Sequence, residues 1–423
     1  MKVLLVNWSW YPTGGDWTYI NNLKTLYERH GHEVISLSTA NEKNVETDSS
    51  AYFINSPDYK SLNKNKSLLN GLKAVGNSVV SYEALKTVSE ILKDHDIKVA
   101  HLHNIHHYIT PAIIWRLKRA GVKIIWSLHD YKIICPERTF VSNGKICERC
   151  ITGSFQQCSL NKCKKSSVSA SMLASAEASF YHTSGIYDKV DAYLCPSAFL
   201  KNKFIQFGFS EDKLAVTNLC YDISLIDDFI CENEKSIVPL QRTVKEDYIL
   251  YVGSILEIKG IRTLINAVKN TNIVLKIVGS GGDEKQLREL VQRENLNNIE
   301  FLGFKDKNSV FELTHNSKFV VCPSEWYENF PFSIIESFLF SKTVVGARIG
   351  GIPELVIHGE TGNLFEAGNV EDLREKLVEL WNNEVLIKIM GAKARKHVYD
   401  IVNFEVHWEK LHSIINNITN NGN

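Results

Sequence analysis

The chain has 423 residues, 44% of them hydrophobic and 23% charged, so it is long enough for two or three domains with apolar cores. Its formal net charge is zero, which argues against a strongly basic nucleic-acid-binding protein. No run of about 18 apolar residues is present, and the first apolar run is too short for a signal-peptide core, so we expect a cytoplasmic protein without a membrane span.

The charges are unevenly distributed along the chain. Residues 1–220 hold 26 Lys and Arg against 19 Asp and Glu, whereas the remainder holds 22 against 29. A basic first half fits peripheral association with an anionic membrane, and it also fits an ordinary solvated surface. Nine cysteines, an odd number in a long chain, argue against a disulfide framework.

The first predicted unit is a strand over residues 3–7, a turn with Gly14 and Gly15, and a helix over residues 16–30. Two adjacent glycines let the backbone approach another molecule, and the amides that follow can hold a phosphate. A plain turn is the alternative. The next predicted strand covers residues 32–39.

Polar side chains end the next two predicted strands. After a helix over residues 82–93, a strand over residues 99–102 leads into a histidine-rich run containing His101, His103 and Asn104. No cysteine or carboxylate stands at ligand spacing there, which argues against a metal site. After a helix over residues 110–120, an apolar strand ends in His129 and Asp130, as a buried parallel strand does when it delivers polar groups to a binding edge. For His129 a buried structural role is the alternative.

A cysteine-rich segment follows, over about residues 135–165. Thiolates at short paired spacings can close a tetrahedron around Zn²⁺, so we predict a structural zinc site, with free thiols or disulfides as the alternatives. The ligands would be Cys147, Cys150, Cys158 and Cys163.

The second half again alternates strands and helices. Predicted strands cover residues 192–195, 214–217, 248–252, 274–279 and 299–304, and the last helices cover residues 370–381 and the region around Trp408. Gly253-Ser254 and Lys259-Gly260 follow the third of these strands.

Residues 319–354 combine the groups that a sugar phosphate requires. A strand over residues 319–322, a polar turn and a helix opening at Pro331 and Ser333 carry Glu328 and Glu336 eight residues apart. Carboxylates accept hydrogen bonds from sugar hydroxyls, and amides at a helix N-terminus attract phosphate. These amides belong to residues 330–333.

The pattern resembles the donor-binding signature of retaining glycosyltransferases of the GT-B fold, in particular glycosyltransferase family 4 (glycosyl transferases group 1). The residues that carry the resemblance are Glu328, Glu336, Gly350, Gly351, Pro353 and Glu354, followed by residues 356–364. The resemblance covers nearly the whole chain. It implies an α/β fold of two Rossmann-like, doubly wound domains facing across a cleft. The implied ranges are 1–235 for an acceptor-side domain with the cysteine-rich insertion, 236–395 for the nucleotide-sugar domain, and 396–423 for a helix that crosses back.

The resemblance also implies a donor site. Lys259 would grip the diphosphate, Glu328 would accept from the donor sugar, and Glu336 would accept from the ribose. The other implied donor-binding residues are Gly14, Gly15, Ser254, Phe304, Asn329, Phe330, Pro331, Phe332 and Ser333. Ser254 stands where the family has an arginine. The resemblance therefore implies that Arg262, Arg348 or a residue of the first domain supplies the missing positive charge.

On the first domain, His129 would lie against the transferred sugar or its β-phosphate. His103, Asn104 and Asp130 would line the cleft on the acceptor side. His129, Glu328 and Lys259 are therefore the predicted catalytic residues.

The implied activity is retaining transfer of a sugar from a UDP- or GDP-sugar to a glycan or polyprenyl-diphosphate-linked acceptor in cell-surface polysaccharide assembly. No cofactor is required for such a reaction. A nucleotide-sugar epimerase or hydrolase of the same fold is one alternative. A non-catalytic subunit that binds a sugar nucleotide or glycan is the other, because Ser254 replaces the arginine.

Overall fold

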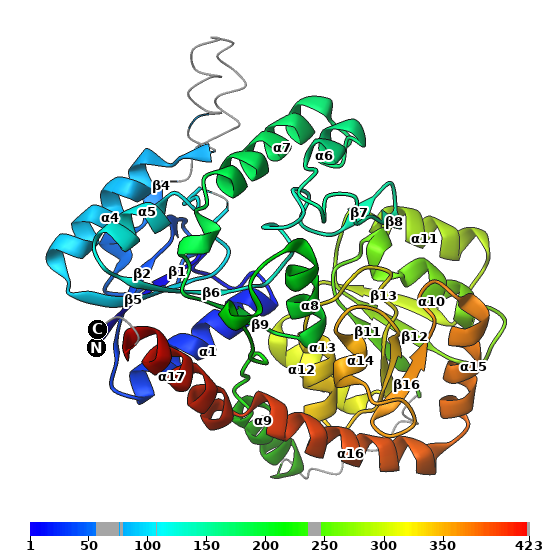
Figure 1. The fold of residues 1–423 in the computed structure, drawn as a ribbon. Helices are drawn as coiled ribbons and strands as arrows, with labels where there is room; N and C mark the ends of the chain where they lie inside the picture. Colours follow the sequence, from blue (N-terminus) through cyan, green and yellow to red (C-terminus); the bar gives the residue numbers. More distant parts are fainter. Residues whose placement is uncertain (56–75, 77–78, 107, 236–246, 421–423) are drawn as a thin grey trace. The chain divides into compact units, whose positions relative to one another are not determined.

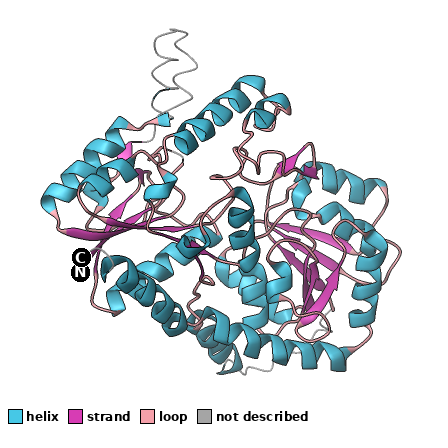
Figure 2. Cartoon of the chain, viewed as in Figure 1, coloured by secondary structure: helices cyan, strands magenta, loops and turns pink. Residues whose placement is uncertain are grey.

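The computed structural model describes residues 1–55, 76, 79–106, 108–235 and 247–420. The chain forms two compact units. Unit 1 comprises Met1–Tyr221 and His407–Asn423, and unit 2 comprises Asp222–Val406. Each unit has a central sheet of strands surrounded by helices, as Figures 1 and 2 show.

Unit 1 is built on a parallel sheet of six strands. Their order across the sheet is β10 (Leu214–Val216), β9 (Ala192–Cys195), β6 (Lys123–Ser127), β5 (Ile97–Leu102), β1 (Lys2–Val6) and β2 (Glu33–Leu37). Two small sheets are formed by β3 (Thr39–Ala40) with β4 (Ile54–Asn55), and by β7 (Val141–Ser142) with β8 (Lys145–Ile146). Its helices are α1 (Gly15–Arg29), α4 (Tyr82–Asp94), α5 (Ile113–Arg119), α6 (Gln156–Leu160), α7 (Val168–Thr183), α8 (Ala198–Phe207) and, from His407 onward, α17 (Phe404–Asn420).

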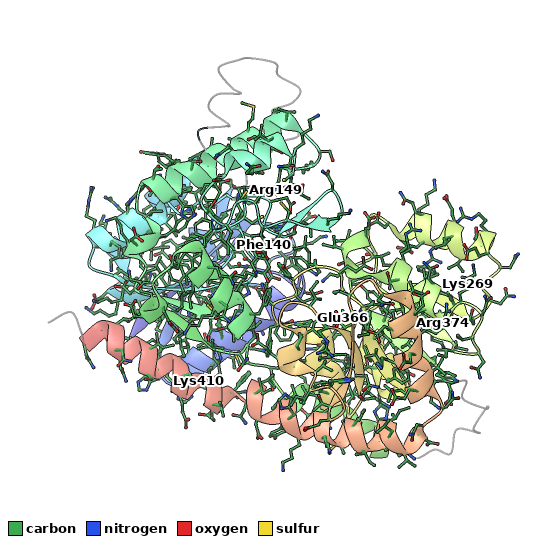
Figure 3. The ribbon with its side chains drawn as sticks, turned by 45° about the vertical axis from the view of Figure 1, so that its right-hand side comes forward. Phe140, Arg149, Lys269, Glu366, Arg374 and Lys410 are labelled. Carbon is green, nitrogen blue, oxygen red and sulfur yellow. The ribbon has the colours of Figure 1, made fainter. Side chains whose placement is uncertain are left out.

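Unit 2 is built on a second parallel sheet of six strands. Their order is β13 (Ile299–Gly303), β12 (Leu275–Val278), β11 (Ile249–Val252), β14 (Phe319–Cys322), β15 (Val344–Ala347) and β16 (Gly362–Phe365). Its helices are α9 (Ser224–Lys235), α10 (Ile261–Val268), α11 (Glu284–Arg293), α12 (Lys307–Asn316), α13 (Phe332–Leu339), α14 (Ile352–Leu355), α15 (Val370–Trp381) and α16 (Glu384–Val402). Arg374 of α15, labelled in Figure 3, connects that helix to α10 by donating to the carbonyls of Asn266 and Ala267 at 2.6 and 2.9 Å.

Both sheets are buried because their strands are apolar on both faces, as parallel strands covered by helices must be. Residues 3–6 of β1 and residues 319–321 of β14 are at most 2% exposed. The predicted α/β class with two Rossmann-like domains is confirmed.

In each sheet, the chain first adds strands toward one edge and then crosses over to add strands toward the other edge. In unit 1 this switch point lies between β1 and β5, and in unit 2 it lies between β11 and β14. Loops that leave the carboxyl ends of two such strands run in opposite directions and leave a crevice, where ligands of this fold class bind.

The segment at the expected boundary between the first and second domains is a helix, α9. α9 packs Phe229 against Phe311 and Phe340, with ring centroids 5.7 Å apart in each pair, and Asp227 accepts from Arg395 at 2.7 Å. These contacts place α9 in unit 2, so the expected boundary at residue 235 falls after the helix rather than before it.

Along the part of the chain that the structure describes, no helix combines the length and the apolar composition needed to cross a bilayer.

Candidate active site

Two loops meet at the switch point of unit 2. The loop after β11 ends in a short turn, Glu257–Lys259, and the loop after β14 begins at Pro323. Between them the amide of Glu325 donates to the carbonyl of Ile258 at 2.8 Å. Gly260 has φ +68°, and a Cβ there would overlap the carbonyl oxygen of Pro323. The glycine after Lys259 is therefore what allows the two loops to approach.

Lys259 and Glu328 form an ion pair across this junction. The Lys259 Nζ lies 2.6 Å from Glu328 Oε1, which also accepts from the Ser324 hydroxyl at 2.6 Å. Glu328 is only 7% exposed. Burial alone would raise its pKa, but the Lys259 charge and the hydrogen bonds outweigh that effect and hold the pKa of Glu328 below its usual value. The carboxylate is therefore ionised at neutral pH.

The Gly-Gly turn supports Glu328 from the opposite side. The amide of Gly351 donates to the Glu328 carbonyl at 2.6 Å. Gly350 has φ +60°, and a Cβ there would come within 2.6 Å of the Glu328 nitrogen. The two glycines thus fix the backbone that carries Glu328, which gives this part of the sequence pattern a structural reason.

Helix α13 begins where the sequence predicted. It starts at Phe332, directly after Pro331, so its N-terminal amides come directly after the loop that holds Glu328 in the sequence. Phe330 is buried and Asn329, Pro331 and Ser333 are half-buried. Glu336 is half-buried in the second turn of α13, eight residues after Glu328.

Two predicted donor-binding residues lie at the surface of unit 2. Phe304 follows β13 and is 80% exposed. Ser254 is exposed, and its carbonyl accepts from the Tyr251 hydroxyl at 2.9 Å. Of the arginines expected to compensate for Ser254, Arg348 pairs with Glu366 at 3.1 Å and Arg262 lies exposed on α10.

The switch point of unit 1 carries a polar cavity of about 210 Å³, roughly the volume of seven water molecules. Its walls come from the loops after β1, β5 and β6, and are formed by Trp8, Thr13, Asp16, Asn104, His106, Asp130, Lys132 and Arg138. Asp16 connects two of the loops, because its Oδ2 accepts from the Asn104 side chain at 3.1 Å and its Oδ1 accepts from the Thr13 hydroxyl at 3.3 Å. Asn104 and Asp130, both predicted to line the cleft, therefore line the same cavity.

His103 lies behind this cavity rather than on its wall. It is 1% exposed, and its Nδ1 lies 2.9 Å from the Nε2 of His129. Burial lowers the pKa of His129 to about 4 and that of His103 well below its ordinary value, so both rings are neutral at pH 7. We therefore assign His103 to the support of His129 and not to contact with an acceptor.

Gly14 and Gly15 open helix α1 beside the same cavity. Gly14 has φ +144° and precedes the first helical residue, Gly15, and the Asp16 side chain accepts from the Trp17 amide at 2.9 Å. A positive φ at Gly14 explains why a glycine stands there.

Sequence reasoning missed six wall residues: Trp8, Thr13, Asp16, His106, Lys132 and Arg138. Asp16 was assigned only to the helix start. Lys132 is 7% exposed and pairs with Glu177 of α7 at 3.0 Å, while its amide donates to Asp130 Oδ1 at 2.8 Å. Proximity to Asp130 in the sequence was the available signal for Lys132, whereas Arg138 is brought in by the path of the cysteine-rich segment.

The cysteines of that segment are free and gather beside α7. Cys150 and Cys158 are buried in an apolar cluster with Phe155, and Cys163 packs against it. Burial, reinforced by the neighbouring thiols, raises the pKa of Cys150 to about 12. Within the described residues, no group of three or more histidine, cysteine or acidic side chains is arranged to hold a metal ion. The zinc site of Cys147, Cys150, Cys158 and Cys163 stays a prediction that this geometry does not support.

Two family models together match most of the chain. The model described as Glycosyltransferase Family 4 matches residues 13–225, and the model described as Glycosyl transferases group 1 matches residues 232–397.

Curated proteins match over shorter stretches. An uncharacterized glycosyltransferase of Methanocaldococcus jannaschii is 37% identical over 147 residues, which cover 35% of this chain and 42% of that protein. The capsular polysaccharide biosynthesis glycosyltransferase CapM of Staphylococcus aureus is 27% identical over 228 residues, which cover 51% of this chain and 59% of CapM. The chain thus spans about half the length of the curated relatives that it matches.

Solved structures match over the full length. The sucrose-phosphate synthase of Thermosynechococcus elongatus has a TM-score of 0.72 at 16% identity and covers 100% of both chains. Anabaena Alr3699/HepE in complex with UDP has a TM-score of 0.66 at 18% identity, covering 99% of this chain and 100% of that one. At these identities the likeness establishes the shared fold.

Proposed function

Because the chain belongs to glycosyltransferase family 4, we propose that it transfers a sugar, with retention of configuration, from a nucleotide-sugar donor to a glycan or a lipid-linked acceptor. The cytoplasmic location expected from the sequence is part of this proposal. The observation that carries it is the ion pair of Lys259 and Glu328 at the switch point of unit 2, beside the start of α13. It combines a cation, an ionised carboxylate and a helix N-terminus at the edge where this fold class binds ligands.

Each of these groups matches one part of a nucleotide sugar. Lys259 and the first amides of α13 would hold the diphosphate, because both attract negative charge. Glu328 would accept from hydroxyls of the sugar, and Glu336, further along α13, would accept from the ribose. The exposed ring of Phe304 offers a surface beside the base. Alr3699/HepE, which shares the fold, has been solved with UDP, and this supports a uridine nucleotide as the first donor to test.

The transfer needs no nucleophile or cofactor from the protein. In front-face retention, the acceptor oxygen bonds to the anomeric carbon from the side of the departing diphosphate. The bond from the sugar to the phosphate breaks, and the donor's own β-phosphate takes the proton of the acceptor hydroxyl. Lys259 and the α13 amides would stabilise the charge that develops on the departing diphosphate. His129, neutral at pH 7, would contribute a hydrogen bond to the transferred sugar or its β-phosphate.

The polar cavity of unit 1 is the proposed acceptor site. Two carboxylates, an amide and an indole ring are the groups that commonly recognise sugar hydroxyls and ring faces, and Asp16, Asp130, Asn104 and Trp8 supply them. CapM is named for capsular polysaccharide biosynthesis, and a relative in Escherichia coli is named O-antigen chain mannosyltransferase C. Both names support a role in assembling a cell-surface polysaccharide.

A donor screen followed by product analysis tests the proposal. Thermal unfolding of the full chain with UDP, GDP and their glucose, N-acetylglucosamine and mannose conjugates should identify one nucleotide family that raises the Tm. Incubation of the stabilising donor with glycan and polyprenyl-diphosphate acceptors should then yield a product with the donor's anomeric configuration.

Three other outcomes contradict the proposal. Isomerised or hydrolysed donor formed at full rate without any acceptor identifies an epimerase or a hydrolase. Donor binding without turnover, across all acceptors, identifies a binding subunit, which the replacement of an arginine by Ser254 would explain. A product of inverted configuration contradicts retention.

A further inference from the structure

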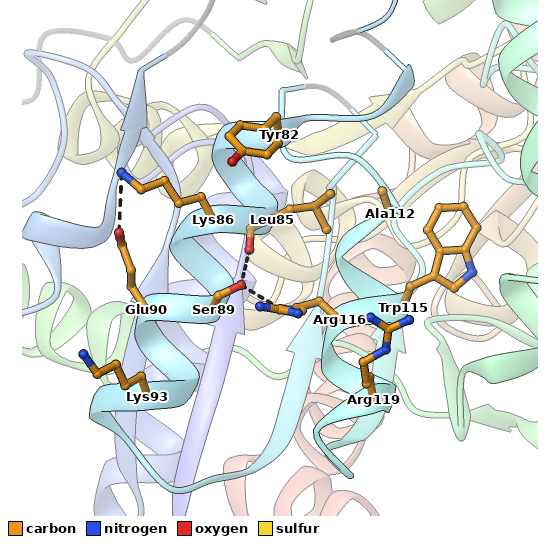
Figure 4. A pocket seen from close by; sticks show the side chains of 10 residues that line it. All are labelled: Tyr82, Leu85, Lys86, Ser89, Glu90, Lys93, Ala112, Trp115, Arg116 and Arg119. Carbon is orange, nitrogen blue, oxygen red and sulfur yellow. Dashed lines mark hydrogen bonds and ion pairs between the residues drawn. The ribbon is translucent and has the colours of Figure 1, made fainter.

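Two features of unit 1 lie outside both candidate sites. One is an open groove of about 590 Å³ between α4 and α5, shown in Figure 4. Polar side chains within it pair with one another, because Lys86 lies 3.6 Å from Glu90 and Arg116 donates to the Ser89 hydroxyl at 2.7 Å. The other feature is the cysteine-rich segment, whose thiols are free. A set of neighbouring thiols has a chemistry of its own, which the activity proposed above does not use.

The end of α6 brings two of these cysteines together. Lys162 follows the helix with a left-handed φ of +49°. The amide of Cys163 donates to the carbonyl of Cys158 at 3.1 Å, and the amide of Lys162 donates to the carbonyl of Ser159 at 3.2 Å. These two hydrogen bonds define the Schellman motif, in which the side chain after the left-handed residue packs against the side chain five positions earlier. In α6 both of these side chains are thiols.

The two thiols share one apolar environment. Cys158 is 1% exposed and clusters with Cys150 and Phe155, and the half-buried Cys163 packs against this cluster. On its other side, the Cys163 thiol donates to the Ser142 hydroxyl of β7 at 3.5 Å. Burial, and after it the adjacent Cys163 thiol, raise the pKa of Cys158 to about 12. A thiolate is therefore costly at Cys158, whereas a disulfide carries no charge and suits the same surroundings.

The backbone holds the pair at a suitable separation for a covalent bond. A disulfide requires Cα atoms about 4.4–6.8 Å apart, and two residues joined by the long hydrogen bond of a Schellman motif meet this condition. We propose that Cys158 and Cys163 form a reversible redox pair at the end of α6, which a peroxide oxidises to a disulfide. In a reducing compartment the pair rests as two thiols and is oxidised only transiently.

The more accessible thiol, Cys163, reacts first. Its sulfur, as the thiolate, attacks one peroxide oxygen, so that an S–O bond forms and the O–O bond breaks. The departing hydroxide takes up the proton that the thiol released. The sulfur of Cys158 then attacks the sulfenic acid, forming the S–S bond and breaking the S–O bond, and the second hydroxide leaves as water with the proton of Cys158. Two thiols and hydrogen peroxide thus give one disulfide and two water molecules.

Thiol titration and peptide mapping of the full chain test this proposal. The reduced chain has nine cysteines, and brief exposure to a low excess of hydrogen peroxide should remove two thiols and leave seven. Mass spectrometry should locate the new linkage between Cys158 and Cys163, and dithiothreitol should restore all nine thiols. Cys163→Ser should abolish the linkage. The matched control Cys231→Ser, at an exposed cysteine of α9, should form it as the wild type does.

Cys150→Ser distinguishes this pair from the other thiols of the cluster. It removes the third thiol but leaves the Schellman motif intact, so the linkage between Cys158 and Cys163 should still form. The proposal is wrong if the wild-type linkage includes Cys150, if all nine thiols persist, or if dithiothreitol does not reverse the loss. It is also wrong if the freshly purified chain holds about one zinc ion and loses thiols only after a chelator removes it, because the cysteines are then metal ligands. Should Cys163→Ser fail to fold, the mapped wild-type linkage and Cys150→Ser still decide.

Discussion

Glu328 is a buried carboxylate that stays charged because neighbouring side chains stabilise its negative charge. Lys259 and Ser324 each contact Oε1 at 2.6 Å, and Gly351 fixes the backbone by donating to the carbonyl of the same residue. An isolated charge would be costly at 7% exposure, so these contacts are what allow an ionised group to be kept at the edge of the sheet. The carboxylate is consequently fixed in position before any donor binds.

Substitution of the two glutamates of this region should affect different kinetic properties. Glu328→Gln keeps the shape but removes the charge near a positively charged transition state, so we expect kcat to fall by about 10²-fold with little change in UDP affinity. Glu336→Ala removes binding that the ground and transition states share, so we expect UDP affinity to fall by about tenfold or more and the donor KM to rise.

Calorimetric UDP affinity and steady-state kinetics of both variants provide the measurement. Glu360→Gln, at an exposed residue beyond the site, is the matched control and should behave as the wild type does. Normal UDP binding by Glu336→Ala, or a wild-type rate for Glu328→Gln, would mean that the donor site is elsewhere.

The loops at the carboxyl ends of β11, β12, β14 and β15 are held by direct contact between backbones. A Cβ at Gly260 would overlap Pro323, one at Gly279 would overlap Gly253, and one at Gly350 would overlap Glu328. Each glycine also has a positive φ. The glycines at these strand ends are thus explained by the fit of one loop against the next.

Gly350→Ala tests whether this fit positions Glu328. The positive φ alone should cost about 1 kcal/mol of stability, and the added methyl group must in addition displace the Glu328 backbone. We expect a larger loss of stability than from φ alone, together with a reduced kcat. Urea unfolding and steady-state kinetics measure the two effects.

Gly359→Ala is the matched control, because Gly359 has φ +79° with no atom within 4 Å of an added Cβ. It should lose about 1 kcal/mol of stability and keep its activity. Equal effects of the two substitutions on both stability and kcat would show that the close approach to Glu328 is unimportant.

Several elements were predictable because their signals are local. The apolar runs of β1, β6, β11 and β14, and the glycine-containing turns that follow β1 and β11, predicted these strands to within a few residues. α7 escaped prediction because its sequence, rich in Ser and Ala, has small residues on both its buried and its exposed sides and so lacks an apolar stripe. α9 was also not predicted, although Ile226 and Phe229 already show helical spacing, because the partners of Phe229 lie more than 80 residues away in the sequence.

At the scale of the whole chain, the candidate sites follow from the order of the strands. The loops with Asp16 and Asn104 meet because β1 and β5 are neighbours, and Lys259 meets Glu328 because β11 and β14 are neighbours. The sequence predicts which residues end each strand. It does not predict which strands pair, because pairing depends on contacts between segments far apart in the chain. Asp16 and Arg138 were missed for that reason, whereas the placement of Lys259 and Glu328 in one donor site was expected from the family resemblance alone.

Four of the described histidines of unit 1 together link its stability to pH: His101, His103 and His407 are buried, and His129 is half-buried. His101 hydrogen-bonds Tyr27 and Ser127, His103 contacts His129, and His407 of α17 lies 3.2 Å from the Tyr19 hydroxyl and 2.8 Å from the Asn218 carbonyl. Burial lowers the pKa of His101 to about 3, lowers those of His129 and His407 to about 4, and lowers that of His103 as well. All four rings are therefore neutral in the folded chain at pH values where they are protonated in the unfolded chain.

Between about pH 6.5 and pH 4 the unfolded chain binds more protons than the folded chain, so stability should fall as the pH is lowered through this range. Each histidine contributes a slope of up to about 1.4 kcal/mol per pH unit. His407→Gln removes one titrating ring, so the slope of unfolding free energy against pH should decrease by about that amount, whatever the substitution does to stability at pH 7. The measurement is urea unfolding at a series of pH values, with His412→Gln, at an exposed histidine of the same helix, as the matched control. An unchanged slope in His407→Gln, or an equal decrease in His412→Gln, would show that acid sensitivity arises from groups other than the buried histidines.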